Sequence, residues 1–294
     1  MTMLIATLVW IHLFTTHLYQ SVWDVQVFHI ANIAWLHSKF VLLIIVLILV
    51  ATLILLLKLI PISLHHFLRF NLKASLFTFL ISCFWDLFKC KEQLWNVSLE
   101  YTLNEIILNL PIEHYLVNLI VPLVFVAYME LAIFKNKKKM TAFVQTSVTW
   151  FHILCLILIL VLNYEYTYTF IVCLVSCAYL LFHFIYENAR VRNQYWTHAL
   201  PFLIVYMLFG EIVTGLVETT PIFVYNQNEI MSFRILSLPS EEMYWFLFIT
   251  LSQYTLYAKA KKALFKESRS NKSEQDQYSR RNSLRVHEDE RSNN

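Results

Sequence analysis

Residues 40–57, with the sequence FVLLIIVLILVATLILLL, decide the fold class of this chain. All eighteen positions are uncharged. A run of this length is typical of a helix that crosses a lipid bilayer, because a hydrocarbon core of about 30 Å is spanned by roughly 20 helical residues. The sequence therefore predicts an integral membrane protein.

Further apolar stretches repeat this pattern along the chain. They cover residues 74–88, 115–134, 140–162, 166–186, 199–217 and 243–258. Together with residues 40–57 they predict an all-α, polytopic membrane protein with seven transmembrane helices. Residues 1–36 are apolar in part but contain His12 and His17. We expect an eighth helix or an interfacial segment there.

The composition excludes several classes of protein. The chain is 58% hydrophobic and 15% charged over 294 residues, which does not suit a soluble domain. Gly210 and Gly215 are its only glycines, whereas dinucleotide and nucleoside triphosphate loops need more glycine in a fixed pattern. The cysteines form no C-x-x-C pair, and the histidines lack metal-ligand spacing. We therefore expect no cofactor and no metal.

Connections rich in lysine and arginine alternate along the chain with connections that are not, and this alternation predicts the topology. Basic connections precede residue 74, follow residue 134, follow residue 186 and begin the tail at Lys259. Because basic loops stay in the cytoplasm, we expect a cytoplasmic C-terminus, with the long loops 89–112 and 218–241 on the opposite face. Residues 263–294 are polar and predicted to be disordered. The basic start of the tail is expected to contact anionic lipid, not nucleic acid.

A Leu-Pro-x-Glu motif occurs twice. Residues 110–114 read LPIEH and residues 238–242 read LPSEE. Each motif follows an exposed loop and precedes an aromatic-rich helix. Taken alone, proline and glutamate at a helix start indicate capping, since proline fits the first turn and the helix dipole favours a carboxylate there. The recurrence in both halves favours a function.

The repeated motif predicts two parallel three-helix units. Residues 37–135 form the first unit, residues 136–165 a linking helix and residues 166–262 the second unit. The linking helix restores the orientation of the second unit, so both motifs lie on the same membrane face, as in parallel-repeat membrane proteins.

Two segments carry a resemblance to a known family. LNLPIEHYLVNLIVPLVFVAYME (residues 108–130) and PIFVYNQNEIMSFRILSLPSEEMYWFLFITLSQYTLYA (residues 221–258) resemble the two halves of the lycopene cyclase domain. That family is a small, flavin-free carotenoid cyclase embedded in the membrane. Further family motifs resemble Trp85-Asp86, Thr214-Gly215, Tyr225-Asn226 and Arg234.

The chain departs from the family pattern mainly in its first half. His114 stands where the family usually has a second glutamate, and Ser98 stands in place of a loop asparagine. In the second half, Ala258 replaces an acid that Glu130 keeps in the first. These changes put the role of the first half in question.

The resemblance implies an enzyme of carotenoid biosynthesis. Its reaction would be the proton-initiated, redox-neutral cyclisation of linear lycopene end groups to β-rings, which makes it an isomerase or intramolecular lyase. The implied substrate is a lipid-soluble carotenoid, and the implied location is the cytoplasmic membrane. A homodimer and an assembly with other carotenoid enzymes are both compatible with the sequence.

The predicted catalytic residues are Glu241, Glu242 and Glu113. Protonating an alkene needs a carboxylic acid that keeps its proton, and both burial and a neighbouring carboxylate raise the pKa of a carboxyl group. Our hypothesis makes Glu241 the proton donor and Glu113 or Glu242 the base or pKa-tuning partner. The reverse assignment of Glu113 and Glu241 is nearly as well supported.

The predicted substrate-binding residues are mainly aromatic, because tryptophan and tyrosine faces stabilise a cation without reacting with it. They are Trp85, Trp95, Tyr225, Tyr244 and Trp245, with Asn226 and Arg234 ordering the loop. Two structural alternatives remain. Boundary aromatics also form interfacial belts, and Arg234 could pair with Glu229 or Glu241.

A transporter or channel is the alternative function, because internal repeats with charges inside the membrane are common in those proteins. Such a protein would carry polar groups at mid-depth on several helices. Here they concentrate at helix starts on one face, with Glu211 and Glu130 as the exceptions.

Overall fold

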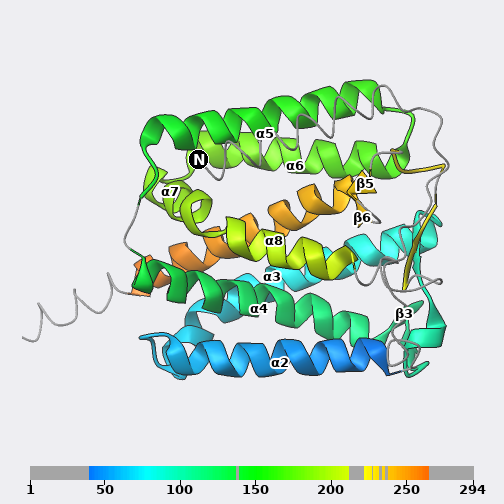
Figure 1. Cartoon of the computed structure of the whole chain (residues 1–294), viewed down its shortest axis with the longest axis horizontal. Helices are drawn as coiled ribbons and strands as arrows, with labels where there is room; N and C mark the ends of the chain where they lie inside the picture. Colours follow the sequence, from blue (N-terminus) through cyan, green and yellow to red (C-terminus); the bar gives the residue numbers. More distant parts are fainter. Residues whose placement is uncertain are drawn as a thin grey trace, which may run out of the picture.

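The computed structural model describes residues 40–136, 139–211, 222–226, 228–231, 234–235 and 238–264. In Figure 1 the long helices lie side by side and roughly parallel, and the short strands gather at one end of the bundle. The predicted helix or interfacial segment over residues 1–36 and the predicted disordered tail lie outside the described residues, apart from residues 263–264 at the end of the last helix.

Each predicted apolar stretch overlaps a helix. In chain order the helices are α2 (Val41–Leu59), α3 (Leu64–Lys91), α4 (Ile112–Lys135), α5 (Ala142–Leu162), α6 (Thr167–Tyr186), α7 (Ala189–His198), α8 (Leu200–Glu211) and a last helix over residues 240–264. Helix α2 packs against α4, α3 against α4, and α5 against α6.

Helices α2, α3, α4, α5 and α6 are each long and apolar enough to cross a membrane. Helix α8 is a shorter apolar helix over Leu200–Gly210. The protein is therefore largely helical and has the helices of a membrane protein, as the sequence predicts.

Helix α3 begins ten residues earlier than the predicted stretch at residue 74. The basic connection predicted before residue 74 takes its charge from Lys58, Arg69 and Lys73, and this prediction is wrong for Arg69 and Lys73, since both lie inside this helix. Ser63 caps the helix by accepting a hydrogen bond from the backbone N–H of His66. The extra turns contain His65, His66, Arg69 and Lys73, so an apolar pattern does not predict them.

The stretch predicted over residues 199–217 begins with a break. Helix α7 ends at His198 and α8 starts at Leu200, with Ala199 between them. Pro201 lies in the first turn of α8, where proline is tolerated but cannot continue a preceding helix.

Two β-hairpins share one register. Strand β2 (Ile106–Ile107) pairs with β3 (Leu110–Pro111), and β5 (Arg234–Ile235) pairs with β6 (Leu238–Pro239). In both, the residue five positions before the proline lies opposite it. Each Leu-Pro-x-Glu motif therefore leaves its hairpin and enters its helix in the same way.

A third pair of strands joins the two halves of the chain. Strand β1 (Trp95–Val97) runs antiparallel to β4 (Phe223–Tyr225), with Asn96 opposite Val224 at the centre. The alignment that sets Pro111 on Pro239 also sets β1 on β4. Each half therefore contributes the equivalent segment to this strand pair.

A buried polar cluster ties the two halves together inside the bundle. Gln253, on the last helix, donates from Nε2 to Asn71 Oδ1 at 2.6 Å and to Ser75 Oγ at 2.9 Å, and it accepts from Thr78 Oγ1 at 2.6 Å. The three partners lie on α3. Because buried amide groups are stable only when paired, this cluster fixes how α3 packs on the last helix.

Candidate active site

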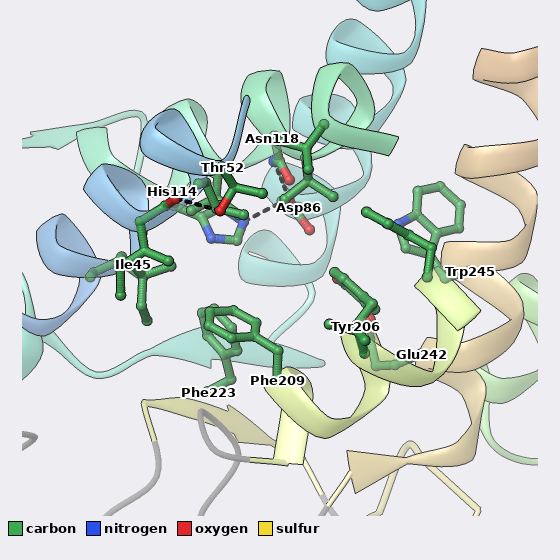
Figure 2. A pocket seen from close by; sticks show the side chains of 18 of the residues that line it. Ile45, Thr52, Asp86, His114, Asn118, Tyr206, Phe209, Phe223, Glu242 and Trp245 are labelled. Carbon is green, nitrogen blue, oxygen red and sulfur yellow. Dashed lines mark hydrogen bonds and ion pairs between the residues drawn. The ribbon is translucent and has the colours of Figure 1, made fainter. Parts of the chain in front are cut away.

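An apolar cavity of about 260 Å³ lies between α2, α4 and α8 and ends against α3, β1, β4 and the last helix. Figure 2 shows Ile45, Phe209 and Phe223 on its apolar side, with Asp86, His114 and Glu242 around the remaining wall. Ile48 and Val205 also line the cavity and are 54% and 64% exposed. The cavity therefore opens between α2 and α8, on a surface that faces lipid in a membrane.

The polar side chains Asp86, Lys89, His114, Asn118 and Glu242 form one wall of the cavity, called the polar wall below. Asp86 lies at its centre. Its Oδ1 accepts from Lys89 Nζ at 2.7 Å, and its Oδ2 accepts from His114 Nε2 at 2.8 Å and from Asn118 Nδ2 at 2.6 Å. Asp86, Lys89 and His114 are 4%, 3% and 6% exposed. A buried carboxylate is stable only with such a full set of partners.

Glu242 joins this wall from the second half of the chain. Its Oε1 accepts a hydrogen bond from the Tyr168 hydroxyl and lies 4.0 Å from Lys89 Nζ. Burial, with the nearby Glu242 carboxylate as a second cause, raises the pKa of the Tyr225 phenol well above its usual value. Tyr225 therefore stays neutral beside Glu242.

The aromatic groups divide into those that face the cavity and those behind it. Tyr206 and Trp245 line the cavity. Trp95 also lines it, but Lys89 Nζ lies 4.2 Å from the centre of its ring. Trp85 packs behind Trp245, with ring centres 5.0 Å apart. Of the predicted aromatic residues, Trp245 is thus the one whose face is best placed for a substrate.

The glutamates of the two Pro-x-Glu motifs do not line the cavity. Glu113 accepts from the backbone N–H of Leu103 at 2.6 Å, and Glu241 accepts from that of Met231 at 2.9 Å. Glu241 also accepts from the Thr169 hydroxyl. Both glutamates are 0% exposed, and each holds the loop before its own helix.

The other predicted residues lie around the loops or on another side of the bundle. Asn226 donates from its side chain to the Gln93 carbonyl at 3.2 Å and so links the two long loops. Arg234 lies in β5 opposite Pro239. Tyr244 lines a second, apolar cavity of about 100 Å³ together with His152. The structure therefore does not bring Tyr244 to the polar wall.

Sequence reasoning missed several members of the wall. Lys89 and Asn118 were not predicted, although Lys89 follows Asp86 by three residues and shares a helix face with it. A charged pair at this spacing near the end of an apolar helix was the available signal. The contact between Asp86 and His114 joins α3 to α4, so no residue spacing along the sequence indicates it.

The last helix also carries an ion pair at its far end. Lys261 Nζ lies 2.7 Å from both carboxylate oxygens of Glu130, at the end of α4. This pairing gives Glu130 a structural partner. Among the described residues, no group of three or more His, Cys, Asp or Glu side chains could hold a metal ion.

The second half of the chain also matches a family model, described as lycopene cyclase, over residues 165–260. This segment belongs to the lycopene cyclase family. The match runs from just before α6 into the last helix, and it includes Tyr168, Tyr206 and Glu242. It confirms the resemblance for this segment and supports a carotenoid cyclase.

The first half of the chain lies outside the match, including Asp86, Lys89 and His114. No curated protein and no solved structure matches the chain.

Proposed function

We propose that this protein cyclises the linear end groups of lycopene to β-rings, in a redox-neutral reaction that begins with proton transfer to an alkene. The observation that carries the proposal is the Glu242 carboxyl at the polar wall of an apolar cavity that opens toward lipid. A long hydrocarbon reaches such a site from the bilayer without crossing water. The family match supports the same reaction class.

The polar wall and the apolar wall of the cavity suit different steps of the reaction. Glu242 gives its proton to the terminal double bond of the substrate and leaves a tertiary carbocation. A second double bond attacks this cation and closes the ring. Tyr206 and Trp245 present aromatic faces to the cation, each contributing about 0.5–2 kcal/mol, and the apolar wall excludes water that would trap it.

The structure favours Glu242 over Glu241 as the proton donor, because Glu242 lines the cavity and Glu241 accepts hydrogen bonds from its own loop. The assignment of Glu241 or Glu113 as donor stays a prediction. In our proposal these two glutamates are positioning residues, which hold the loops that carry the helix starts at the cavity.

We further propose that the chain contains two parallel repeats. The first is formed by α2, α3 and α4, and the second by α6, by α7 with α8, and by the last helix. The alignment of Pro111 on Pro239 matches the starts of α2, α3 and α4 to those of α6, α7 and the last helix to within three residues. The shared hairpin register and the β1–β4 contact support the same relationship. We also propose a cytoplasmic membrane location with the C-terminus in the cytoplasm, on the basis of the basic connections.

Expression in lycopene-accumulating bacterial cells, followed by pigment chromatography, tests the function. We expect lycopene to be replaced by carotenes with one or two β-rings. The Glu242→Gln variant, present in the membrane at the same level, should leave lycopene unchanged. Unchanged lycopene with the wild-type chain in the membrane would refute the proposal.

A further inference from the structure

His114 takes the place in the first half that Glu242 takes in the second. Each residue follows a Pro-x-Glu motif by one position, and each lines the cavity. In Figure 2 the His114 ring lies between Asp86 and the apolar side of the cavity, and Glu242 lies on another part of the wall. The residue that follows each Pro-x-Glu motif therefore lines the cavity, one from each half.

The contact with Asp86 determines which nitrogen of His114 is free. Asp86 Oδ2 accepts a hydrogen bond from His114 Nε2 at 2.8 Å, so Nε2 carries the hydrogen. In a neutral imidazole the other nitrogen, Nδ1, then has a lone pair. Nδ1 is buried and has no hydrogen-bond partner among the described residues. The lone pair thus belongs to a residue that lines the cavity, and no other described residue engages it.

The charges of the wall leave one proton to be shared. The Lys89 ammonium and the Asp86 carboxylate neutralise each other at 2.7 Å. A neutral wall then has two forms: protonated Glu242 with neutral His114, or ionised Glu242 with protonated His114. These two forms carry the same total charge, and they differ only in where one proton resides.

We propose that His114 is the catalytic base that removes the proton from the cyclised carbocation, with Asp86 as its positioning residue. This inference rests on the proposed function. It assigns the first half of the chain a role that the family match does not cover, and it explains how a histidine can stand at this position in an active enzyme.

The proton balance closes within the site. Glu242 loses a proton as a C–H bond forms at the CH carbon of the terminal double bond, which leaves the tertiary cation, and a C–C bond from the second double bond then closes the ring and moves the cation to a ring carbon. His114 Nδ1 takes a proton from the ring carbon next to the cation, and the electrons of that C–H bond form the ring double bond. Return of the proton from His114 to Glu242 restores the first form, so no oxidant, reductant or net proton is consumed.

The test uses membranes that contain the full chain, with lycopene added and cyclic products measured by chromatography. His114→Ala should reduce turnover by about 100-fold or more, as expected for loss of a general base. Added imidazole should restore part of the turnover, and His114→Glu should keep more activity than His114→Gln. His152→Ala is the matched control, since His152 is a partly buried histidine in the second cavity.

The outcomes separate the two proposals. Rescue of His114→Ala by imidazole, with no effect of imidazole on the wild type or on His152→Ala, supports the base. Wild-type activity in His114→Ala overturns it, as does a loss that neither imidazole nor His114→Glu reverses at equal membrane levels. An inactive wild-type chain in the membrane overturns the cyclase itself.

Discussion

Glu113 and Glu241 make the same hydrogen bond, each accepting from the backbone N–H ten residues earlier in the chain. The donors are Leu103 and Met231, and both glutamates are fully buried. The Pro-x-Glu motif thus ties the start of a helix to the loop before it, in both halves. This relationship explains the recurrence of the motif without a direct role in proton transfer.

Glu113→Gln and Glu241→Gln should therefore lower stability by similar amounts. A glutamine places an NH₂ group where a buried carboxylate oxygen was, and an unpaired buried donor costs about 1–3 kcal/mol. Thermal unfolding of the purified protein in detergent measures this. Glu92→Gln is the control, since Glu92 is exposed. Stability equal to that of the control would contradict the loop-holding role.

Glu242→Gln and Glu241→Gln should differ in activity. Removing the proton donor is expected to lower turnover by about 100-fold or more, whereas removing a positioning residue should leave measurable ring formation per folded molecule. Product formation in membranes, divided by the amount of folded protein, makes the comparison. If Glu241→Gln abolishes cyclisation and Glu242→Gln retains it, Glu241 is the donor, as the sequence analysis predicted.

Lys89→Met should destabilise the protein strongly. Lys89 is 3% exposed and lies 2.7 Å from Asp86, so its removal leaves a buried carboxylate without its counter-charge. Breaking a buried pair in this way costs about 3–5 kcal/mol. Unfolding measurements on Lys89→Met, Asp86→Asn and the double variant test the coupling. Additive losses would mean that the two side chains do not stabilise each other.

Val205→Trp should hinder substrate at the opening of the cavity. Val205 is 64% exposed and lines the cavity, so a larger side chain there narrows the passage between α2 and α8. We expect at least about tenfold lower turnover at low lycopene, since misplacing a substrate by about 1 Å can cost 100-fold. Leu154→Trp, on the exposed side of α5, is the control. Equal activity of both variants would place the substrate's path elsewhere.

Much of the helical structure could be predicted, because an apolar run such as residues 40–57 has few alternatives to a membrane helix. The start of α3 could not be predicted from hydropathy, since Arg69 and Lys73 interrupt the apolar pattern without interrupting the helix. Ser63 at its N-cap was the local signal that was overlooked. Pro201 likewise marked the break between α7 and α8.

The site was predicted less completely. The repeated motif predicts Glu242 and Trp245, both of which line the cavity, and His114 departs from the family pattern in the first copy of the motif. The sequence leaves the packing of these residues open. It could not show that His114 contacts Asp86 or that Glu241 faces its own loop, because these contacts depend on helix rotation and packing. One position along a helix changes the direction of a side chain by about 100°, which is enough to separate Glu241 from the cavity that Glu242 lines.

The most direct test of the proposed reaction is the mass and ring content of the pigment formed when lycopene is incubated with membranes containing the chain, without added flavin or nicotinamide. A redox-neutral cyclisation gives a product of the same mass as lycopene, with β-rings, and no product with Glu242→Gln. Lycopene that stays linear with the wild-type chain in the membrane, or a product of altered mass, would contradict the proposal.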